Sequence, residues 1–228
     1  PTHDRAPVLI GAVLAEQGQF AEAERYFDKF GRNKNNKKPY LAHFYKGKIR
    51  ESRGQKFYGS AIKAYLRSIG KEPSAGLPVM ALAELYSKMG REKKAIQLVQ
   101  SFQEKFGPTK KTAHFLSKAF LERELYKKAY KQLGILEDYE ADNLNVKVKM
   151  ALILIEMKSY KMAVAKLEEI LNVAPDSDKI RFYLGAVYEE LKQPKLAVEH
   201  FLRIQPNSNY YNEAVIHAAY LHKSQNDL

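Results

Sequence analysis

An alanine recurs at a fixed spacing of 34 residues along most of this chain, in the series Ala61, Ala95, Ala129, Ala163 and Ala197. Each alanine lies in a segment of helical apolar periodicity that follows an earlier helical segment. A fixed period of this length, with two helices per unit, is typical of a helical solenoid. The small residue has a physical reason, because two antiparallel helices approach to roughly 8–10 Å only where little side chain lies at their crossing.

The segment from Met150 to Pro175 shows what one such unit contains. Six apolar residues, 150–155, are followed by a polar turn at 156–160 and by a second helical pattern through Ala163. The apolar run is much shorter than the about 20 residues that a membrane-spanning helix needs. We therefore expect a helix, a short turn and a second helix packed back on the first, with Pro175 ending the unit.

Other residues recur in the same register as the alanines. In chain order the copies contain Ile10, Gly11, Leu14, Gly18, Phe20, Ala23 and Phe27; Gly47, Gly54, Ala61, Tyr65 and Pro73; Leu82, Ala83, Tyr86, Gly90 and Ala95; Leu116, Phe120, Tyr126, Ala129 and Leu133; Leu154, Tyr160, Ala163, Leu167 and Pro175; and Leu184, Gly185, Tyr188, Ala197, Phe201 and Pro206. This pattern resembles the tetratricopeptide repeat (TPR) family. The second copy departs from it, since Lys46 and Arg50 replace a leucine and an aromatic residue and extra residues lengthen 33–39 and 55–60.

The resemblance implies an all-α fold, a right-handed TPR solenoid of antiparallel helix pairs with six full repeats plus a terminal helix. The expected repeats are approximately 4–37, 38–75, 76–109, 110–143, 144–177 and 178–211, and 212–228 forms the first helix of a partial seventh repeat. Because no linker is long enough to divide the chain, we expect a single solenoid over 1–228. The seventh repeat lacks its second helix, so we expect that another segment or a partner covers it, or that the tail was trimmed.

The chain carries no motif that indicates catalysis, a metal site or a cofactor. Cysteine is absent, which excludes disulfides, thiolate ligands and a cysteine nucleophile. There is no Walker-type loop, no G-x-G-x-x-G and no H-E-x-x-H motif. The histidines are scattered over the chain: His3, His43, His114, His200, His217 and His222. We interpret the adjacent glutamates Glu168-Glu169 and Glu189-Glu190 as solvated or capping charges, and we expect no enzyme, no bound metal and no cofactor.

By the resemblance, the first helices line a concave groove through the second, fifth, ninth, twelfth and thirteenth positions of each repeat. In the fifth and sixth repeats these positions include an apolar stripe of Val148, Leu152, Ile155 and Phe182. In the fourth repeat they include Lys111, His114 and Lys118, which come nearest to the residues with which some TPR domains clamp a terminal carboxylate.

We expect the apolar stripe to bind a peptide or partner segment, with Lys111 and Lys118 selecting its charge. Two alternatives remain open for the same residues. The stripe packs against neighbouring first helices, or it binds another copy of the chain in a homo-oligomeric scaffold.

The formal net charge of +12 is concentrated in one segment of the sequence. Between Gly31 and Tyr58 there are nine Lys or Arg residues and one acid, a net of +8. The expected basic patch is formed by Arg32, Lys34, Lys37, Lys38, Lys48, Arg53 and Lys56. It is interpreted as a solvated face, or as a site for an acidic protein or an anionic membrane surface. Interleaved aromatic residues would also suit single-stranded nucleic acid, but their spacing fits a helix-pair core, so nucleic acid is the least favoured partner.

We therefore expect a non-enzymatic protein–protein interaction scaffold that docks a peptide or partner segment in its groove. The alternatives are an anion-binding module working through residues 32–56 and a self-assembling scaffold. No stretch resembles a signal peptide or a membrane helix. We expect a soluble protein, cytoplasmic or periplasmic, and the sequence leaves its compartment open. The identity of the partner is left open by the sequence.

Overall fold

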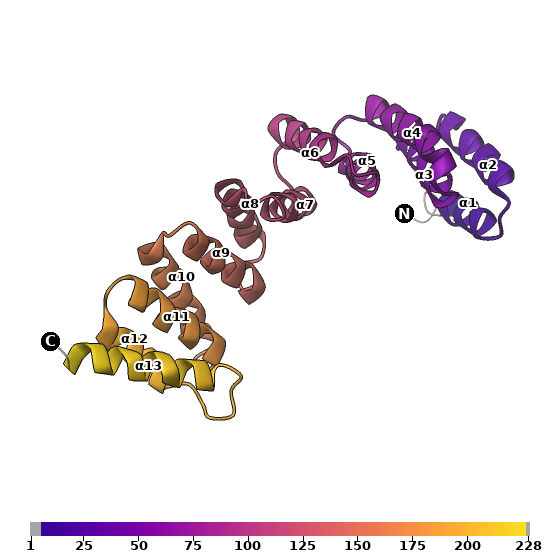
Figure 1. Cartoon of the computed structure of the whole chain (residues 1–228). Helices are drawn as coiled ribbons and strands as arrows, with labels where there is room; N and C mark the ends of the chain where they lie inside the picture. Colours follow the sequence, from indigo (N-terminus) through magenta and orange to yellow (C-terminus); the bar gives the residue numbers. More distant parts are fainter. Residues whose placement is uncertain (1–5, 227–228) are drawn as a thin grey trace. The chain divides into compact units, whose positions relative to one another are not determined.

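The computed structural model describes residues 6–226, which form thirteen α-helices and one short 3₁₀-helix (Figure 1). The helices are α1 (Ala6–Glu16), α2 (Phe20–Arg32), α3 (Tyr40–Ser52), η1 (Gln55–Phe57), α4 (Tyr58–Lys71), α5 (Gly76–Lys88), α6 (Glu92–Phe106), α7 (Lys110–Leu121), α8 (Tyr126–Tyr139), α9 (Leu144–Glu156), α10 (Tyr160–Val173), α11 (Asp178–Glu190), α12 (Pro194–Leu202) and α13 (Tyr211–Asn226). His3 and the expected repeat residues 4, 5, 227 and 228 lie outside the described range. The all-α expectation is confirmed.

The helices pack in consecutive pairs, such as α1 with α2, α9 with α10 and α11 with α12. The recurring alanine lies on the second helix of each pair, and all six copies are completely buried: Ala23, Ala61, Ala95, Ala129, Ala163 and Ala197. Six pairs are followed by α13, as the repeat count predicted. The period found in the sequence therefore marks the point of closest approach within each hairpin.

The turns inside five of the six hairpins are closed by the same backbone hydrogen bond whatever residue has the positive φ; the turn at Gly54 differs, with ψ of −175° and a 3₁₀-helix after it. Gly18, Gly54 and Gly90 have positive φ in the first three repeats. Glu124, Lys158 and Lys192 take the same place in the next three, with φ of 56°, 54° and 59°. After five of them, all but Gly54, an amide donates back over the turn, as from Ser159 N–H to the Leu154 carbonyl at 2.8 Å. This left-handed ending satisfies carbonyls that the last turn of a helix leaves free.

Three of the first helices carry a glycine against which an aromatic ring of the second helix packs. A Cβ atom on Gly11, Gly47 or Gly185 would lie 2.3–2.5 Å from ring carbons of Phe27, Tyr65 or Phe201. All three rings are almost completely buried. The glycines are therefore required by close packing within the hairpin.

The irregular second repeat gains an extra element from its inserted residues. η1 lies between α3 and α4 and begins after Gly54, whose φ is 96°. The longer connection at 33–39 is held by asparagine side chains: Asn36 donates to the Phe30 carbonyl at 3.0 Å and accepts from Lys38 N–H at 2.8 Å. The insertions thus fold locally and leave the α3–α4 hairpin intact.

The contacts within the chain define two compact units, which we call unit 1 (residues 1–112) and unit 2 (residues 113–228). The boundary falls inside α7. In unit 2 the core runs through α9 to α13 and includes Leu154, Leu167, Leu184 and Phe201. In unit 1 buried clusters surround Phe27 and Tyr65. None of the helices in the described range combines the length and hydropathy that crossing a bilayer requires.

Candidate functional site

Unit 2 contains a pocket of about 420 Å³, which we call the unit 2 pocket. It is formed by α9, α11 and α13 with the start of α10. Its lining residues are Leu152, Ile155, Glu156, Tyr160, Tyr183, Ala186, Val187, Glu189, Glu190 and His217. Apolar side chains and carboxylates therefore meet in one hollow, which is the usual composition of a site that both buries and orients a ligand.

The helix α9 divides its apolar run between core and pocket. Met150, Ala151 and Leu154 are buried, at 3%, 0% and 2% exposure. Leu152 and Ile155 are only half-buried and line the pocket. Leu152 is at the ninth position of its repeat and Ile155 is at the twelfth. The TPR resemblance assigns both positions to the groove. The helical period thus explains why one hydrophobic run serves two surfaces.

Val148 and Phe182, the other two members of the expected apolar stripe, pack against the core cluster of unit 2. Phe182 is half-buried, with its ring centroid 5.7 Å from that of Phe201 and 5.3 Å from that of Tyr210. Neither residue lines the unit 2 pocket. For these two positions the geometry favours the alternative of packing against neighbouring helices.

The expected basic stripe of Lys111, His114 and Lys118 lies exposed along α7. Lys118 is 3.8 Å from the carboxylate of Glu122, one turn further along the helix. None of the three residues lines the unit 2 pocket. The structure therefore does not bring this stripe together with Leu152 and Ile155 in one pocket.

The charged residues that do line the pocket are acidic, which the sequence analysis missed. Glu156, Glu189 and Glu190 come from the last turns of α9 and α11. Glu189 lies 2.8 Å from Nδ1 of His217, and Glu190 accepts a hydrogen bond from the Tyr160 hydroxyl at 3.2 Å. The signal was available, because these carboxylates occupy the twelfth and thirteenth repeat positions already assigned to the groove.

Unit 1 contains a second hollow of about 410 Å³, which we call the unit 1 pocket. It is lined by Ala12, Ala15, Phe27, Tyr45, Lys48, Ile49, Glu51, Ser52 and Lys88. Residues at the ninth, twelfth and thirteenth positions of their repeats also line the unit 1 pocket. Two of these residues are lysines, Lys48 and Lys88. Glu51 is occupied within the fold, since it accepts from the Tyr65 hydroxyl at 2.6 Å.

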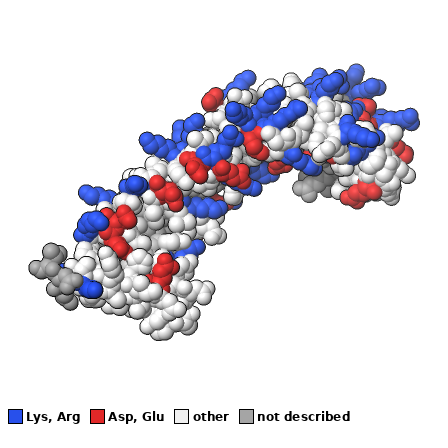
Figure 2. All heavy atoms as spheres, viewed as in Figure 1, with Lys and Arg blue, Asp and Glu red and all other residues white. Residues whose placement is uncertain are grey.

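The formal charge differs sharply between the two units. Unit 1 has 22 Lys or Arg against 10 Asp or Glu, a net of +12, whereas unit 2 has 16 of each and no net charge. On the face drawn in Figure 2, Lys and Arg gather over the N-terminal helices, and the C-terminal helices are mostly white. The excess noted in the sequence is therefore a property of unit 1.

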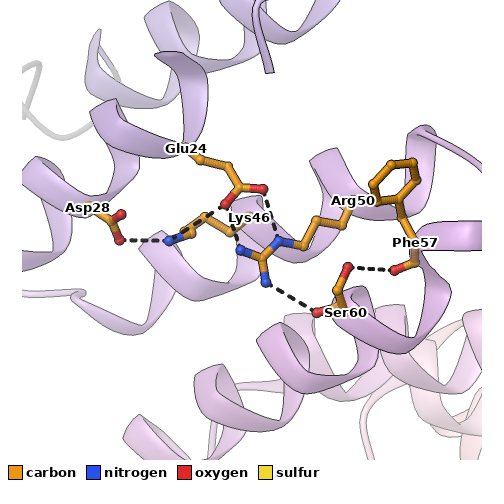
Figure 3. A network of polar contacts seen from close by, with 6 residues as sticks. All are labelled: Glu24, Asp28, Lys46, Arg50, Phe57 and Ser60. Atoms are coloured by element: carbon orange, nitrogen blue, oxygen red, sulfur yellow. Dashed lines mark hydrogen bonds and ion pairs between the residues drawn. The ribbon is translucent and has the colours of Figure 1, made fainter. Parts of the chain in front are cut away.

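Two of the nine cations counted between residues 31 and 58 are neutralised by acids of α2 (Figure 3). Arg50 donates from Nε and Nη2 to the two carboxylate oxygens of Glu24, at 2.9 and 2.6 Å, and from Nη1 to the Ser60 carbonyl at 3.3 Å. Lys46 donates to Asp28 at 2.8 Å. The charge pairs replace the apolar contact that the family pattern has at positions 46 and 50.

Hydrogen bonds from Arg50 hold the pKa of the Glu24 carboxyl below its usual value, although partial burial acts in the opposite direction. The same bonds raise the pKa of Arg50. About 21% of each of these two side chains remains exposed, so solvent screens part of the interaction. The pair nevertheless ties α2 to α3, and through Ser60 to α4.

The seven residues of the expected basic patch, which does not include Lys46 or Arg50, are all exposed, but they differ in their contacts. The Arg53 guanidinium carbon lies 3.8 Å from the centre of the Phe57 ring and 5.0 Å from that of Phe20. Lys48 is 3.9 Å from Glu51 and lines the unit 1 pocket. No ion pair links the other five cations to any residue that the structure describes: Arg32, Lys34, Lys37, Lys38 and Lys56.

Among residues 6–226 no group of three or more His, Cys, Asp or Glu side chains could hold a metal ion. His217 is paired with Glu189, and His200 stacks on Tyr188 with ring centroids 5.4 Å apart. The histidines at these two positions therefore belong to separate packing environments.

The sequence matches no family model and no curated protein. The solved structures that share the fold include the following three. YrrB, described as a TPR protein with an unusual peptide-binding site, is 14% identical with a TM-score of 0.59, over 86% of this chain and 97% of that one. MamA (AMB-1) is 17% identical with a TM-score of 0.57, over 72% and 89% of the two chains. A tetratricopeptide repeat protein from Parabacteroides merdae is 11% identical with a TM-score of 0.54, over 97% and 86%. This likeness confirms the TPR fold inferred from the sequence.

Proposed function

We propose that this chain is a non-enzymatic protein-interaction scaffold that docks a partner segment in the unit 2 pocket. The observation that carries the proposal is the half-buried apolar floor of Leu152, Ile155 and Ala186 within that hollow. When a partner covers apolar side chains that are accessible in a concave site, the burial of their surface stabilises the complex. The description of YrrB as a TPR protein with a peptide-binding site supports docking as a use of this fold. Fold alone does not supply function, so the pocket residues have to be tested directly.

A single segment docked in a pocket of this size should bind with a dissociation constant near the micromolar range, which corresponds to about 8 kcal/mol. The entropy cost of ordering the bound segment offsets part of the favourable interaction free energy. We therefore expect moderate affinity that rises when several segments are joined in one partner.

Exchanging Leu152 for glutamate is expected to weaken docking about tenfold or more. The new carboxylate would stand in the apolar floor beside Ile155 and add to the negative charge of Glu156. The measurement is a selection of random displayed peptides on the intact chain, followed by the dissociation constants of the enriched peptides for the wild type and for Leu152→Glu.

The matched control is Leu202→Glu, which makes the same change on the exposed end of α12, where Leu202 is 62% exposed and does not line the pocket. Circular dichroism should show unchanged helicity in both variants. Peptides that bind equally well to Leu152→Glu and to the wild type would contradict docking at this site. Loss of helicity in Leu152→Glu would instead show that the residue belongs to the core, and Ala186→Gln would then serve to fill the pocket.

A second candidate function is anion binding by the basic connection between α2 and α3. Arg32, Lys34, Lys37 and Lys38 lie exposed on or beside a loop whose shape is held by Asn33 and Asn36. These cations fall within seven residues of the sequence and form no ion pair with a described acid. Such a cluster attracts an acidic partner by long-range electrostatics.

Charge reversal at Lys37 and Lys38 together is expected to weaken binding of a polyglutamate peptide about tenfold and to leave docking in the unit 2 pocket unchanged. The reason is that both side chains are exposed on the loop, whereas Lys46 and Arg50 are already neutralised. Lys161→Glu with Lys195→Glu makes the same change of net charge on unit 2 and is the control. If the control variant weakens polyglutamate binding as much, the overall charge is responsible and the loop is not the site.

A salt titration distinguishes the kind of anion. A steep loss of binding with added salt for a single-stranded oligonucleotide, but not for polyglutamate, would favour nucleic acid instead.

A further inference from the structure

The edge of the unit 2 pocket carries negative charge that the fold does not neutralise. Glu156 and Glu190 are exposed and form no ion pair with a described residue, and the one hydrogen bond onto Glu190 comes from the neutral Tyr160 hydroxyl. The ion-pair partner of Glu189 among residues 6–226 is His217, at 2.8 Å. No Lys or Arg side chain of the described residues lines the pocket. A segment that enters it therefore meets carboxylates as soon as it leaves the apolar floor.

This acidity is local and contrasts with the rest of the molecule. Unit 2 as a whole has no net charge, and the unit 1 pocket, formed by the same repeat positions, carries Lys48 and Lys88 with one glutamate. That glutamate, Glu51, is already engaged by the Tyr65 hydroxyl. The two hollows thus differ in the sign of their charge while sharing their place in the repeat.

We propose that the unit 2 pocket selects a partner segment in which a large apolar side chain is flanked by lysine or arginine. This inference rests on the proposed docking function and adds the chemistry of the partner. The apolar side chain lies on Leu152, Ile155 and Ala186, and the flanking cations lie against Glu156 and Glu190. Opposite charge placed at the rim of a site gives specificity and faster association, and it disfavours an acidic segment that has the same apolar residue.

The test uses synthetic peptides that share one Leu-Ile core and differ only in flanks of lysine, glutamine or glutamate. Each is titrated by fluorescence anisotropy against the intact chain at physiological ionic strength. The lysine-flanked peptide is expected to bind about tenfold more tightly than the glutamine-flanked one, and the glutamate-flanked peptide more weakly than both. Equal binding of the three, or tighter binding of the glutamate-flanked peptide, would overturn the inference.

The decisive variant is Glu156→Gln with Glu190→Gln, which removes the charge with almost no change of shape. It is expected to bind the glutamine-flanked peptide as the wild type does and to lose most of the preference for lysine flanks. Glu122→Gln with Glu124→Gln changes the net charge of unit 2 equally, outside the pocket, and should leave the preference intact. A preference that survives in the first variant, or vanishes in the second, contradicts the assignment to the pocket.

Failure of the docking function itself gives a different result. In that case binding of every peptide, whatever its flanks, would be absent or insensitive to Leu152→Glu. If binding depends on Leu152 but not on the flanking charge, docking stands and the selection of a basic segment is wrong.

Discussion

Replacing Gly185 with alanine is expected to lower the free energy of unfolding by about 2 kcal/mol. The added Cβ would lie 2.4 Å from one carbon of the Phe201 ring and 2.7 Å from two others. That ring is 1% exposed and packs against Phe182 and His217, with centroids 5.7 and 5.3 Å away, so it has little room to move. Alanine is the better helix former by about 1 kcal/mol, but the overlap outweighs this gain. Urea unfolding followed by circular dichroism measures the change.

Gly134 provides the matched control in the same unit. It lies inside α8, and a Cβ there would meet nothing within 4 Å. Gly134→Ala is therefore expected to raise the free energy of unfolding by about 0.5–1 kcal/mol. Phe201→Leu, which shortens the side chain, should make the cost of Gly185→Ala smaller than in the wild type. Two glycine substitutions that stabilise equally would show that Gly185 does not carry a packing constraint.

Replacing Arg50 with methionine is expected to lower the free energy of unfolding by about 2 kcal/mol at neutral pH. The variant keeps much of the apolar stem but removes both hydrogen bonds to Glu24 and the one to Ser60. Glu24, 21% exposed, would keep Lys46 at 3.8 Å and the more distant charge of Arg53. Partial exposure keeps the loss below that of a fully buried pair. In the Arg50→Met background, Glu24→Gln should lower the free energy of unfolding by less than it does in the wild type.

The contribution of the Glu24–Arg50 pair should also depend on pH. Because Arg50 lowers the pKa of the Glu24 carboxyl in the folded chain, this stabilisation is present above the ordinary value of 4.5 and is lost as the pH falls through the lowered value. The wild type and Arg50→Met should therefore approach each other in stability in acid. Urea unfolding of both chains at pH 7 and in acid tests this, and a difference in stability that stays constant would argue against the pair.

Much of the fold follows from local pattern. The recurrence of Ala163 and its equivalents predicted the helix pairs, since a small residue at a fixed period marks the crossing of two helices. The register of the TPR resemblance assigned Leu152 to the groove side and Leu154 to the packed side, which are different faces of the helix. The insertion before α4 was also found, but its 3₁₀ conformation was not, because short irregular segments carry little periodic signal.

Charge pairing could not be obtained in this way. Lys46 and Arg50 were counted as part of a basic segment, yet their partners Asp28 and Glu24 lie 18 and 26 residues earlier. Similarly, the interpretation of Glu189 as a solvated charge did not anticipate that α13 places His217 beside it. An ion pair depends on distances of a few ångströms between separate helices, and no local pattern carries that information.

The sequence by itself determined that this chain forms TPR-type helix pairs and which small residues lie where the helices of a pair cross. That information is local, since it consists of a helical period and of the small residues that let two helices touch. Only the tertiary structure decided which faces of the first helices are hollow, which of their charges remain unpaired, and that the unit 2 pocket is acidic within a basic chain. These properties arise where side chains from three separate first helices meet.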